Sequence, residues 1–259
     1  MALSGKTAII TGGARGIGFA TAEELLKSGV EKVLILDVGQ SLDPARENTL
    51  KLINAQASIF YSQCDITDKS ALEGIFRKND LGRLDILVNC AGVLCEHDVA
   101  RAVAVNLTGL IDCTMLAFDV MGKHKSGSGG AVVNIASIAG FEPMDLCAVY
   151  SATKSGVIGF TRAMGSKDVF EHTGIKVVAI CPGGTDTDMV MSKGECAIKV
   201  TFPWLEAKQI ALLEQIPLQK PSAVGKAVVQ AVLTAQPGSI WISNEDKVTP
   251  MHYGENTFF

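Results

Sequence analysis

The pair of residues with the clearest chemical potential in this sequence is Tyr150 and Lys154. On a helix, this i,i+4 spacing places the phenol and the ammonium on one face, one turn apart. A free tyrosine ionises near pH ~10, too high for a base at neutral pH, but a neighbouring positive charge lowers the pKa of the phenol. The same pair also arises by chance on helix surfaces, so its meaning depends on the residues around it.

Ser137 is the second candidate, because it follows the apolar run Asn134–Ala136 at the end of an expected strand. The carboxyl ends of parallel strands are where α/β sheets hold ligands. Ser137 could therefore hydrogen-bond the same substrate oxygen that Tyr150 deprotonates. The alternative is an ordinary serine that caps a turn or a helix.

A glycine-rich run, TGGARGIG from Thr11 to Gly18, joins the first expected strand to a helix. Glycines allow a tight turn and a close backbone approach, and the free N–H groups at a helix N-terminus favour a pyrophosphate. The order of strand, glycine run and helix predicts a dinucleotide site rather than an ordinary turn.

Asp37 ends the second expected strand, 19 residues after Gly18. A carboxylate at this position accepts hydrogen bonds from the adenosine ribose and repels a 2′-phosphate, which predicts NAD rather than NADP. Arg15 is the basic residue that argues the other way. No second basic residue follows Asp37 directly, where Val38 begins the next turn. The alternative for Asp37 is a residue that only ends a strand.

Short apolar runs alternate with segments of helical length, and these elements would position the candidate residues. Runs apolar on both faces predict the strands Thr7–Thr11, Lys32–Asp37, Ser58–Gln63, Asp85–Asn89, Ala131–Ala136, Lys176–Cys181 and Ser239–Ile242. Three- and four-residue apolar spacing predicts helices at Gly18–Ser28, Ser70–Asn79, Val99–Met121 and Tyr150–Gly165. We expect one doubly wound, Rossmann-type α/β domain over residues 1–259, with a seven-stranded, mainly parallel sheet and helices on both faces.

Two segments depart from this alternation. Residues 185–213 are long for a connection and carry Met189, Met191, Phe202 and Trp204, which predicts an apolar lid over a substrate site. Residues 244–259 predict a C-terminal arm, which either frays or docks on a partner subunit or a pocket.

Composition narrows the class of protein. The chain has 259 residues and a net charge of −4, so nothing attracts it to nucleic acid or anionic lipid. Its seven cysteines lack metal-ligand spacing, and we expect no metal site and reduced thiols in the cytoplasm. The sequence shows no signal-like N-terminus and no unbroken apolar run of about 18 residues, so we expect no membrane span.

Together these residues resemble the short-chain dehydrogenase/reductase family over essentially the whole chain. The matching positions are Thr11, Gly12, Gly16 and Gly18; Asp65 in the run Cys64–Ile66; Asn89, Ala91 and Gly92; Asn106; Ser137; Tyr150 and Lys154; and Pro182 and Gly183. Two positions depart from the family pattern: Cys90 replaces a second asparagine, and Gly184 replaces an asparagine or aspartate. We expect these changes to alter local packing and backbone shape.

The resemblance implies a mechanism and a set of binding residues. Tyr150 would take the alcohol proton, Ser137 would position the oxygen, Lys154 would hold the nicotinamide ribose, and Asn106 would maintain a water-linked proton path without a metal. The implied cofactor-binding set is Gly12, Arg15, Gly16, Ile17, Gly18, Asp37, Val38, Asp65, Ile66, Asn89, Ala91, Gly92, Tyr150, Lys154, Pro182, Gly183, Thr185 and Thr187.

Two subgroups are similar in local sequence. Gly82–Asn89, Gly127–Ala131 and Gly159–Arg162 resemble 15-hydroxyprostaglandin dehydrogenases, whereas Leu34–Asp37, Ala104–Leu110 and Gly238–Trp241 resemble insect alcohol dehydrogenases. Both resemblances imply a dimeric, NAD-dependent enzyme that oxidises alcohols. We expect a mostly apolar substrate wall, formed by Leu94, Ile138, Met144, Leu146, Met189 and Phe202.

The sequence therefore predicts reversible, NAD-dependent oxidation of an apolar primary or secondary alcohol to an aldehyde or ketone, with Tyr150 as the base. Two alternatives stay open: an NADPH-dependent carbonyl reductase, and an NAD-binding protein without turnover. The helices around Val99–Met121 and Tyr150–Gly165 carry more apolar surface than one core needs, which predicts a homodimer.

Overall fold

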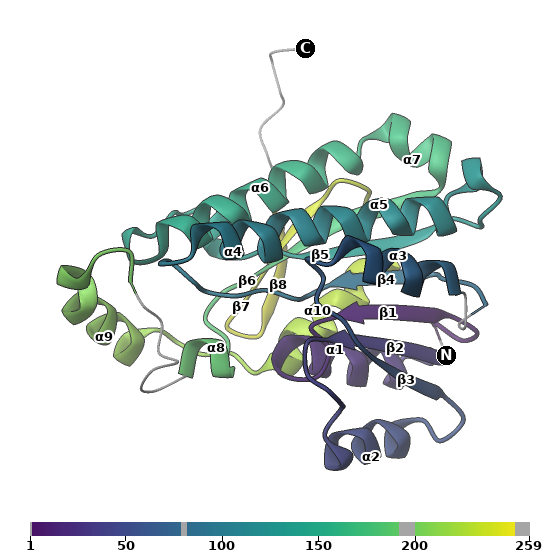
Figure 1. Cartoon of the computed structure of the whole chain (residues 1–259), viewed down its shortest axis with the longest axis horizontal. Coiled ribbons are helices and arrows are strands. Elements are labelled where there is room, and N and C mark those ends of the chain that lie inside the picture. Colours follow the sequence, from purple (N-terminus) through teal and green to yellow (C-terminus); the bar gives the residue numbers. More distant parts are fainter. Residues whose placement is uncertain (1, 79–81, 192–199, 252–259) are drawn as a thin grey trace.

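The computed structural model of the chain describes residues 2–78, 82–191 and 200–251 (Figure 1). Its strands form one sheet in the order β3-β2-β1-β4-β5-β6-β7-β8. All neighbours pair in parallel except β7 and β8, which are antiparallel. The strands are β1 Thr7–Thr11, β2 Lys32–Asp37, β3 Ser58–Gln63, β4 Ile86–Asn89, β5 Gly130–Ile135, β6 Ile175–Pro182, β7 Ile240–Asn244 and β8 Lys247–Met251.

The predicted doubly wound α/β fold is confirmed, but the sheet has an eighth strand that the sequence analysis did not expect. β8 lies within the predicted C-terminal arm, and its hairpin turn uses Glu245 and Asp246 at φ 50° and 60°. An Asn-Gly pair is the usual signal for such a turn, and this sequence lacks it. Pro250 is tolerated in β8 because the strand is at the edge of the sheet. Residues 252–259 of the predicted arm lie outside the described residues.

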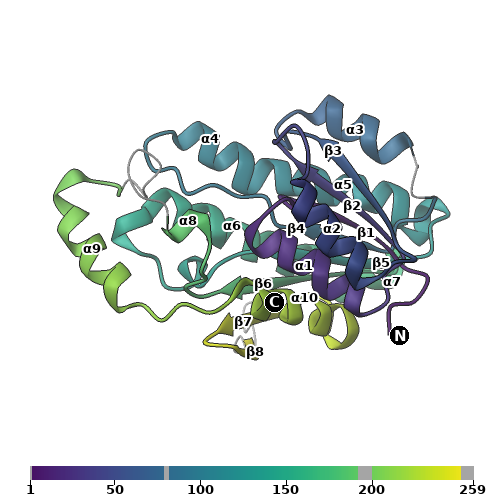
Figure 2. The same cartoon turned by 90° about the horizontal axis from the view of Figure 1, so that it is seen from below.

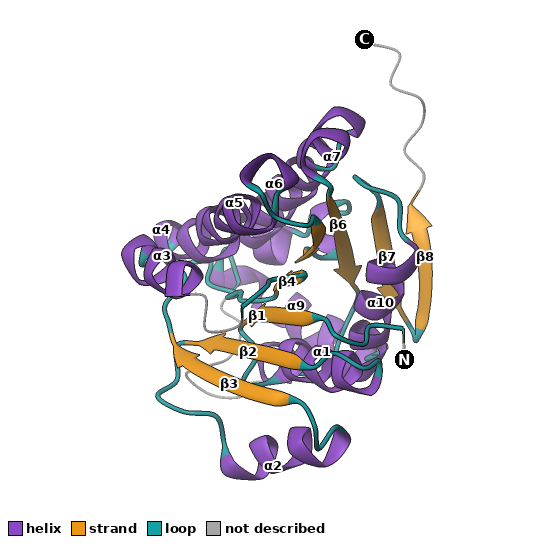
Figure 3. Cartoon of the chain, turned by 90° about the vertical axis from the view of Figure 1, so that its right-hand side faces the viewer, coloured by secondary structure: helices purple, strands orange, loops and turns teal. Residues whose placement is uncertain are grey.

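Helices cover both faces of the sheet, as the views in Figures 1 and 3 show. One face carries α1 Gly16–Lys27, α2 Pro44–Ile53 and α10 Pro221–Thr234; the other carries α3 Lys69–Lys78, α4 Val99–Val103, α5 Leu110–Met121, α6 Ala148–Met164 and α7 Lys167–Thr173. Alternate residues of β1 serve the two cores: Ile10 packs with Leu25 and Val228, and Ile9 packs with Phe118.

The segment Val99–Met121 is one helical run, in which a π-helical stretch at Ala104–Gly109 joins α4 to α5. By length and composition alone this run could cross a membrane, which differs from the sequence expectation; 39% of its most apolar window is buried in the fold. The buried face packs on β4, β5, α3 and α6. Val99, Val103, Met115 and Val120 of the same run are exposed. Its apolar residues are therefore divided between the core and the surface.

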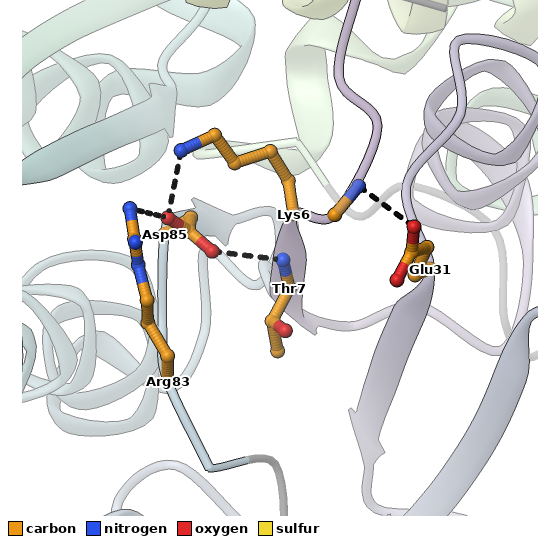
Figure 4. A network of polar contacts seen from close by, with 6 residues as sticks. Lys6, Thr7, Glu31, Arg83 and Asp85 are labelled. Atoms are coloured by element: carbon orange, nitrogen blue, oxygen red, sulfur yellow. Dashed lines mark hydrogen bonds and ion pairs between the residues drawn. The ribbon is translucent and has the colours of Figure 1, made fainter.

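A charged cluster fixes the amino ends of β1 and β4 (Figure 4). The buried Asp85 carboxylate accepts a hydrogen bond from the Thr7 N–H at 3.1 Å and pairs with Lys6 and Arg83. These contacts keep the register between β1 and β4, and the register in turn sets the relative position of their carboxyl ends.

The described part of the predicted lid includes α8 Asp188–Met191 and α9 Glu206–Gln215, which lie on the same side of the molecule (Figures 1 and 2). Residues 192–199 of this segment lie outside the described residues. The part that follows them is anchored by a small apolar cluster of Leu146, Val200 and Leu205.

Candidate functional site

A cavity of about 1040 Å³ opens at the carboxyl ends of β1 to β6. It lies where the strand order reverses between β1 and β4, the position at which doubly wound sheets bind ligands. The volume is at the upper end of the ~300–1,000 Å³ found for small-molecule pockets. The cavity therefore has room for an elongated cofactor together with a second small molecule.

The glycine-rich run forms one wall of the cavity, and its close backbone contacts leave no room for side chains at two of its glycines. Gly12 has φ 65°, and a Cβ there would lie 2.7 Å from the Ala91 Cα. A Cβ on Gly18 would lie 2.2 Å from the Gly12 carbonyl oxygen. The residue before α1, Arg15, makes no side-chain capping bond to the helix. Gly16, Ile17 and Gly18, the first residues of α1, line the cavity, and a helix N-terminus there suits the diphosphate of a dinucleotide.

Asp37 and Val38 line the far end of the cavity, where the Asp37 carboxylate accepts a hydrogen bond from Ala14 N at 3.0 Å. Arg15 lies nearby but pairs with Asp188 at 3.5 Å. A second guanidinium is close: Arg46 Nη1 donates to the Ala14 carbonyl at 2.6 Å. Arg46 lies on α2 and was not among the residues predicted from the sequence, because no motif marks this helix.

The segment after β4 is held by hydrogen bonds to two neighbouring strands. Thr11 Oγ1 accepts from the N–H groups of Cys90 and Ala91 at 3.1 and 3.2 Å. Asn89 is buried below the cavity rather than on its wall, and its amide donates to Thr114 and Asn134. Cys90, the departure from the family pattern, lines the cavity, and burial raises the pKa of its thiol to about 12.

Asn106 lies in the π-helical stretch and is also fully buried. Its amide oxygen accepts from Val93 N, and its amide nitrogen donates to Val93 O, both at 2.8 Å. The same nitrogen donates to Thr153 Oγ1 at 3.2 Å. Asn106 does not line the cavity; its side chain joins the segment after β4 to α6.

Ser137, Tyr150 and Lys154 all line one side of the cavity. Ser137 follows β5, and Tyr150 and Lys154 occupy successive turns of α6, with the Lys154 ammonium 5.5 Å from the centre of the Tyr150 ring. Burial raises the pKa of Tyr150 above its ordinary value, and a hydrogen bond with Ser137 opposes that rise. Burial lowers the pKa of Lys154 to about 8, although Lys154 Nζ donates to the Ile135 carbonyl at 2.7 Å.

This arrangement can take a proton from, or give one to, a single oxygen atom of a bound substrate. A phenol that shares a hydrogen bond with a serine hydroxyl presents two groups to the same substrate atom. A lysine ammonium beside the phenol favours the phenolate, and an added positive charge would favour it further.

The end of β6 and the segment after it form another part of the wall, since Pro182, Gly183, Thr185 and Thr187 all line the cavity. Thr185 Oγ1 donates to the Gly183 carbonyl at 2.9 Å. Gly184, the second departure from the family pattern, packs closely against the backbone of a neighbouring segment. A Cβ at this position would lie 2.8 Å from the Pro217 carbonyl oxygen. Asp65 and Ile66, after β3, also lie on the wall.

The expected apolar wall is only partly present. Leu94, Ile138, Met144 and Met189 line the cavity, together with Leu212 and Ile216, which the sequence analysis missed. Leu146 and Phe202 differ from the expectation because neither lines the cavity.

The positions of these two residues have a simple physical reason. Leu146 is buried against Val200 and Leu205. Phe202 is 52% exposed and stacks on Trp204, with ring centres 5.7 Å apart. The side chain of Met191 lies outside the described part of the chain. An apolar residue type indicates burial or contact but not the partner, so these residues could not be assigned from sequence.

Comparisons with known proteins agree with this geometry. The model of the short chain dehydrogenase family matches residues 6–197. Alcohol dehydrogenase 1 of Ceratitis capitata is 36% identical, and the match covers 100% of both chains. The 15-hydroxyprostaglandin dehydrogenase [NAD(+)] of Homo sapiens is 38% identical over 74% of this chain and 73% of its own length. The structure of carveol dehydrogenase from Mycobacterium avium in complex with NAD has the same fold, with a TM-score of 0.78, 24% identity and coverage of 94% and 97% of the two chains.

Proposed function

The chain belongs to the short-chain dehydrogenase family, and we propose that it oxidises an apolar primary or secondary alcohol, reversibly, to the aldehyde or ketone with NAD. The observation that carries this proposal is the convergence of Ser137, Tyr150 and Lys154 on one side of the cavity that the glycine-rich run also lines. The names of the two relatives described above are consistent with this reaction.

We propose NAD as the cofactor because of Asp37. Its carboxylate is fixed at the end of β2 by the Ala14 N–H and lies where it can accept hydrogen bonds from ribose hydroxyls. The same negative charge would repel a 2′-phosphate. When bound, NAD supplies the hydride acceptor for the reaction.

The chain's own residues handle the proton. Tyr150 Oη accepts the proton of the alcohol hydroxyl, and Ser137 Oγ donates a hydrogen bond to the same substrate oxygen. Lys154 stabilises the Tyr150 phenolate through its charge. Asn106 acts by position: it holds the Gly92–Val93 segment against α6, so that the cofactor wall and the base keep a fixed separation.

An apolar substrate is supported by the lining of the cavity near Tyr150. Leu94, Ile138, Met144 and Leu212 are carbon-rich walls. Such a pocket binds an alkyl or terpenoid alcohol by burying its hydrocarbon part, whereas a sugar would leave its hydroxyls without partners.

One observation supports the NADPH-dependent alternative, a carbonyl reductase. Arg46 brings a guanidinium next to Ala14, and Arg15 is on the cavity wall. A direct comparison of NAD with NADP separates the two proposals. The second alternative, an NAD-binding protein without turnover, is opposed by the intact set of Asn106, Ser137, Tyr150 and Lys154.

The test is a panel of apolar alcohols, from short secondary alcohols through terpenols to hydroxylated fatty acids, assayed by the absorbance of the reduced cofactor with NAD and with NADP. We expect turnover with NAD, and the best substrate would define the subgroup. Faster ketone reduction with NADPH would favour the reductase. NAD binding without turnover of any alcohol or ketone would favour the binding protein.

We also propose a homodimer in the cytoplasm. The dimer is supported by the exposed apolar face of the run Val99–Met121, which carries Val99 at 54% and Met115 at 45% exposure. The cytoplasmic location is supported by the free thiols of the described cysteines.

A further inference from the structure

The helix that carries Tyr150 begins with N–H groups that no residue of the helix can satisfy. The N-cap residue of α6 makes no side-chain capping bond. Partners come instead from two distant residues: Ala148 N donates to Thr201 Oγ1 at 3.1 Å, and the N–H groups of Val149 and Tyr150 donate to the two Glu96 carboxylate oxygens at 2.9 Å each. The base itself is therefore bound through its backbone to Glu96.

Glu96 is a buried acid, 6% exposed, in the segment between β4 and α4. Besides the two N–H groups of α6, it accepts a hydrogen bond from Thr201 Oγ1 at 2.9 Å. A carboxylate at the N-terminus of a helix is stabilised by the helix dipole, and hydrogen bonds to a charged acceptor are the stronger kind. The Glu96 carboxylate thus caps α6 from another part of the chain, and the same carboxylate contacts Thr201 of the predicted lid.

Thr201 links this cap to the wall of the substrate cavity. Its N–H donates to the Leu146 carbonyl at 3.0 Å. Next to it, Val200 and Leu205 pack on Leu146 in a cluster that also contacts two cavity-lining residues, Met144 and Leu212. One carboxylate therefore contacts both the start of α6 and Thr201, whose neighbours Val200 and Leu205 pack with residues of the cavity wall.

We propose that Glu96 is a positioning residue for the alcohol oxidation, and that it sets Tyr150 and the substrate wall in one geometry. The proposal rests on the proposed function. Tyr150 is the third residue of α6, so loss of the cap would let the first turn fray and move the phenol. A displacement of about 1 Å at a reacting group can cost about 100-fold in rate.

Two variants separate the two contacts of Glu96. Glu96→Gln puts an amide NH₂ opposite a backbone N–H, so we expect kcat to fall about 10- to 100-fold. Thr201→Val removes the hydroxyl, and with it the bond from Ala148 N, but keeps the bonds from Val149 N and Tyr150 N to Glu96. We therefore expect an about 10-fold rise in KM for the alcohol and a smaller change in kcat than in Glu96→Gln. Glu142→Gln, the same change at an exposed position, is the matched control and should behave as wild type.

Amide hydrogen exchange at Val149 and Tyr150 gives a readout that does not depend on turnover. We expect exchange there to become faster in Glu96→Gln and to change little in Glu142→Gln, with the affinity for NAD retained in both. Wild-type kcat and KM in Glu96→Gln would overturn the proposal. So would a loss of thermal stability in Glu96→Gln and Thr201→Val without any change in kcat or KM. If Glu96→Gln does not fold, the KM of Thr201→Val decides. If wild type oxidises no alcohol, the proposed function fails, and the exchange rates still decide whether Glu96 caps α6.

Discussion

Replacing Lys154 with methionine should remove activity and yet stabilise the fold at neutral pH. Lys154 is 4% exposed, and burial lowers the pKa of its ammonium from an ordinary value of 10.5 to about 8. At about 1.4 kcal/mol per pKa unit, keeping this charge in the folded state costs about 3 kcal/mol. Methionine forfeits the hydrogen bond to the Ile135 carbonyl, worth about 1.5–3 kcal/mol. The net gain is then about 0–2 kcal/mol, which is characteristic of a site where function opposes stability.

The pH dependence gives the sharper test, because its sign is fixed. The folded pKa lies below the unfolded one, so the unfolded state binds more protons between the two values, and wild-type stability rises as pH increases through that window. The methionine variant lacks this rise. Its stability relative to wild type should therefore fall by about 2–3 kcal/mol between about pH 7 and about pH 10, so that the advantage disappears or reverses.

The assay is urea unfolding followed by tryptophan fluorescence, at one protein concentration and several pH values. Lys226→Met, which removes an exposed lysine, is the matched control and should follow the wild-type pH dependence. A free-energy difference between wild type and Lys154→Met that stays constant with pH would refute the reasoning, because it would mean that the lysine charge carries no burial cost.

Three further predictions concern the base, the cofactor and assembly. Burial raises the pKa of Tyr150, so alcohol oxidation should speed up as pH rises towards about 8, the range in which Lys154 keeps its charge, while ketone reduction, which needs the protonated phenol, should not; equal profiles would contradict this. Asp37→Ser should raise the ratio of kcat/KM with NADP to kcat/KM with NAD by about 10-fold or more, because Arg46 can then bind a 2′-phosphate without an opposing carboxylate. Adding Arg46→Ala to this variant should reverse the shift. Met115→Glu should convert a dimer seen by sedimentation into monomer, whereas wild type that sediments as a monomer at micromolar concentration would exclude the dimer.

The parts of the fold that sequence could predict are those set by local patterns. A strand buried on both faces reads as an unbroken apolar run, so β1 was predicted with the bounds that the structure has. The bounds of β2 and β3 were also predicted, although β3 lies at the edge of the sheet and has no buried residue. β8 was missed because its turn uses Glu245 and Asp246 and its strand contains Pro250, and neither is a hairpin signal.

The candidate site divides in the same way. Tyr150 and Lys154 are visible in sequence because one helix turn brings them together, and the glycine-rich run is visible because a turn and a helix follow one strand. Glu96 meets Tyr150 across 54 residues and Thr201 across 105. Neither pairing leaves a local pattern, so only the folded chain reveals the cap.

The central claim, that Tyr150 is the base of an NAD-dependent alcohol oxidation, is tested most directly by comparing wild type with Tyr150→Phe. The substitution removes only the hydroxyl, and Tyr61→Phe makes the same change at a tyrosine outside the cavity wall. With the best alcohol of the panel and saturating NAD, we predict that Tyr150→Phe lowers kcat by about 100-fold or more, whereas Tyr61→Phe retains it. Turnover by Tyr150→Phe at the wild-type rate would contradict the account.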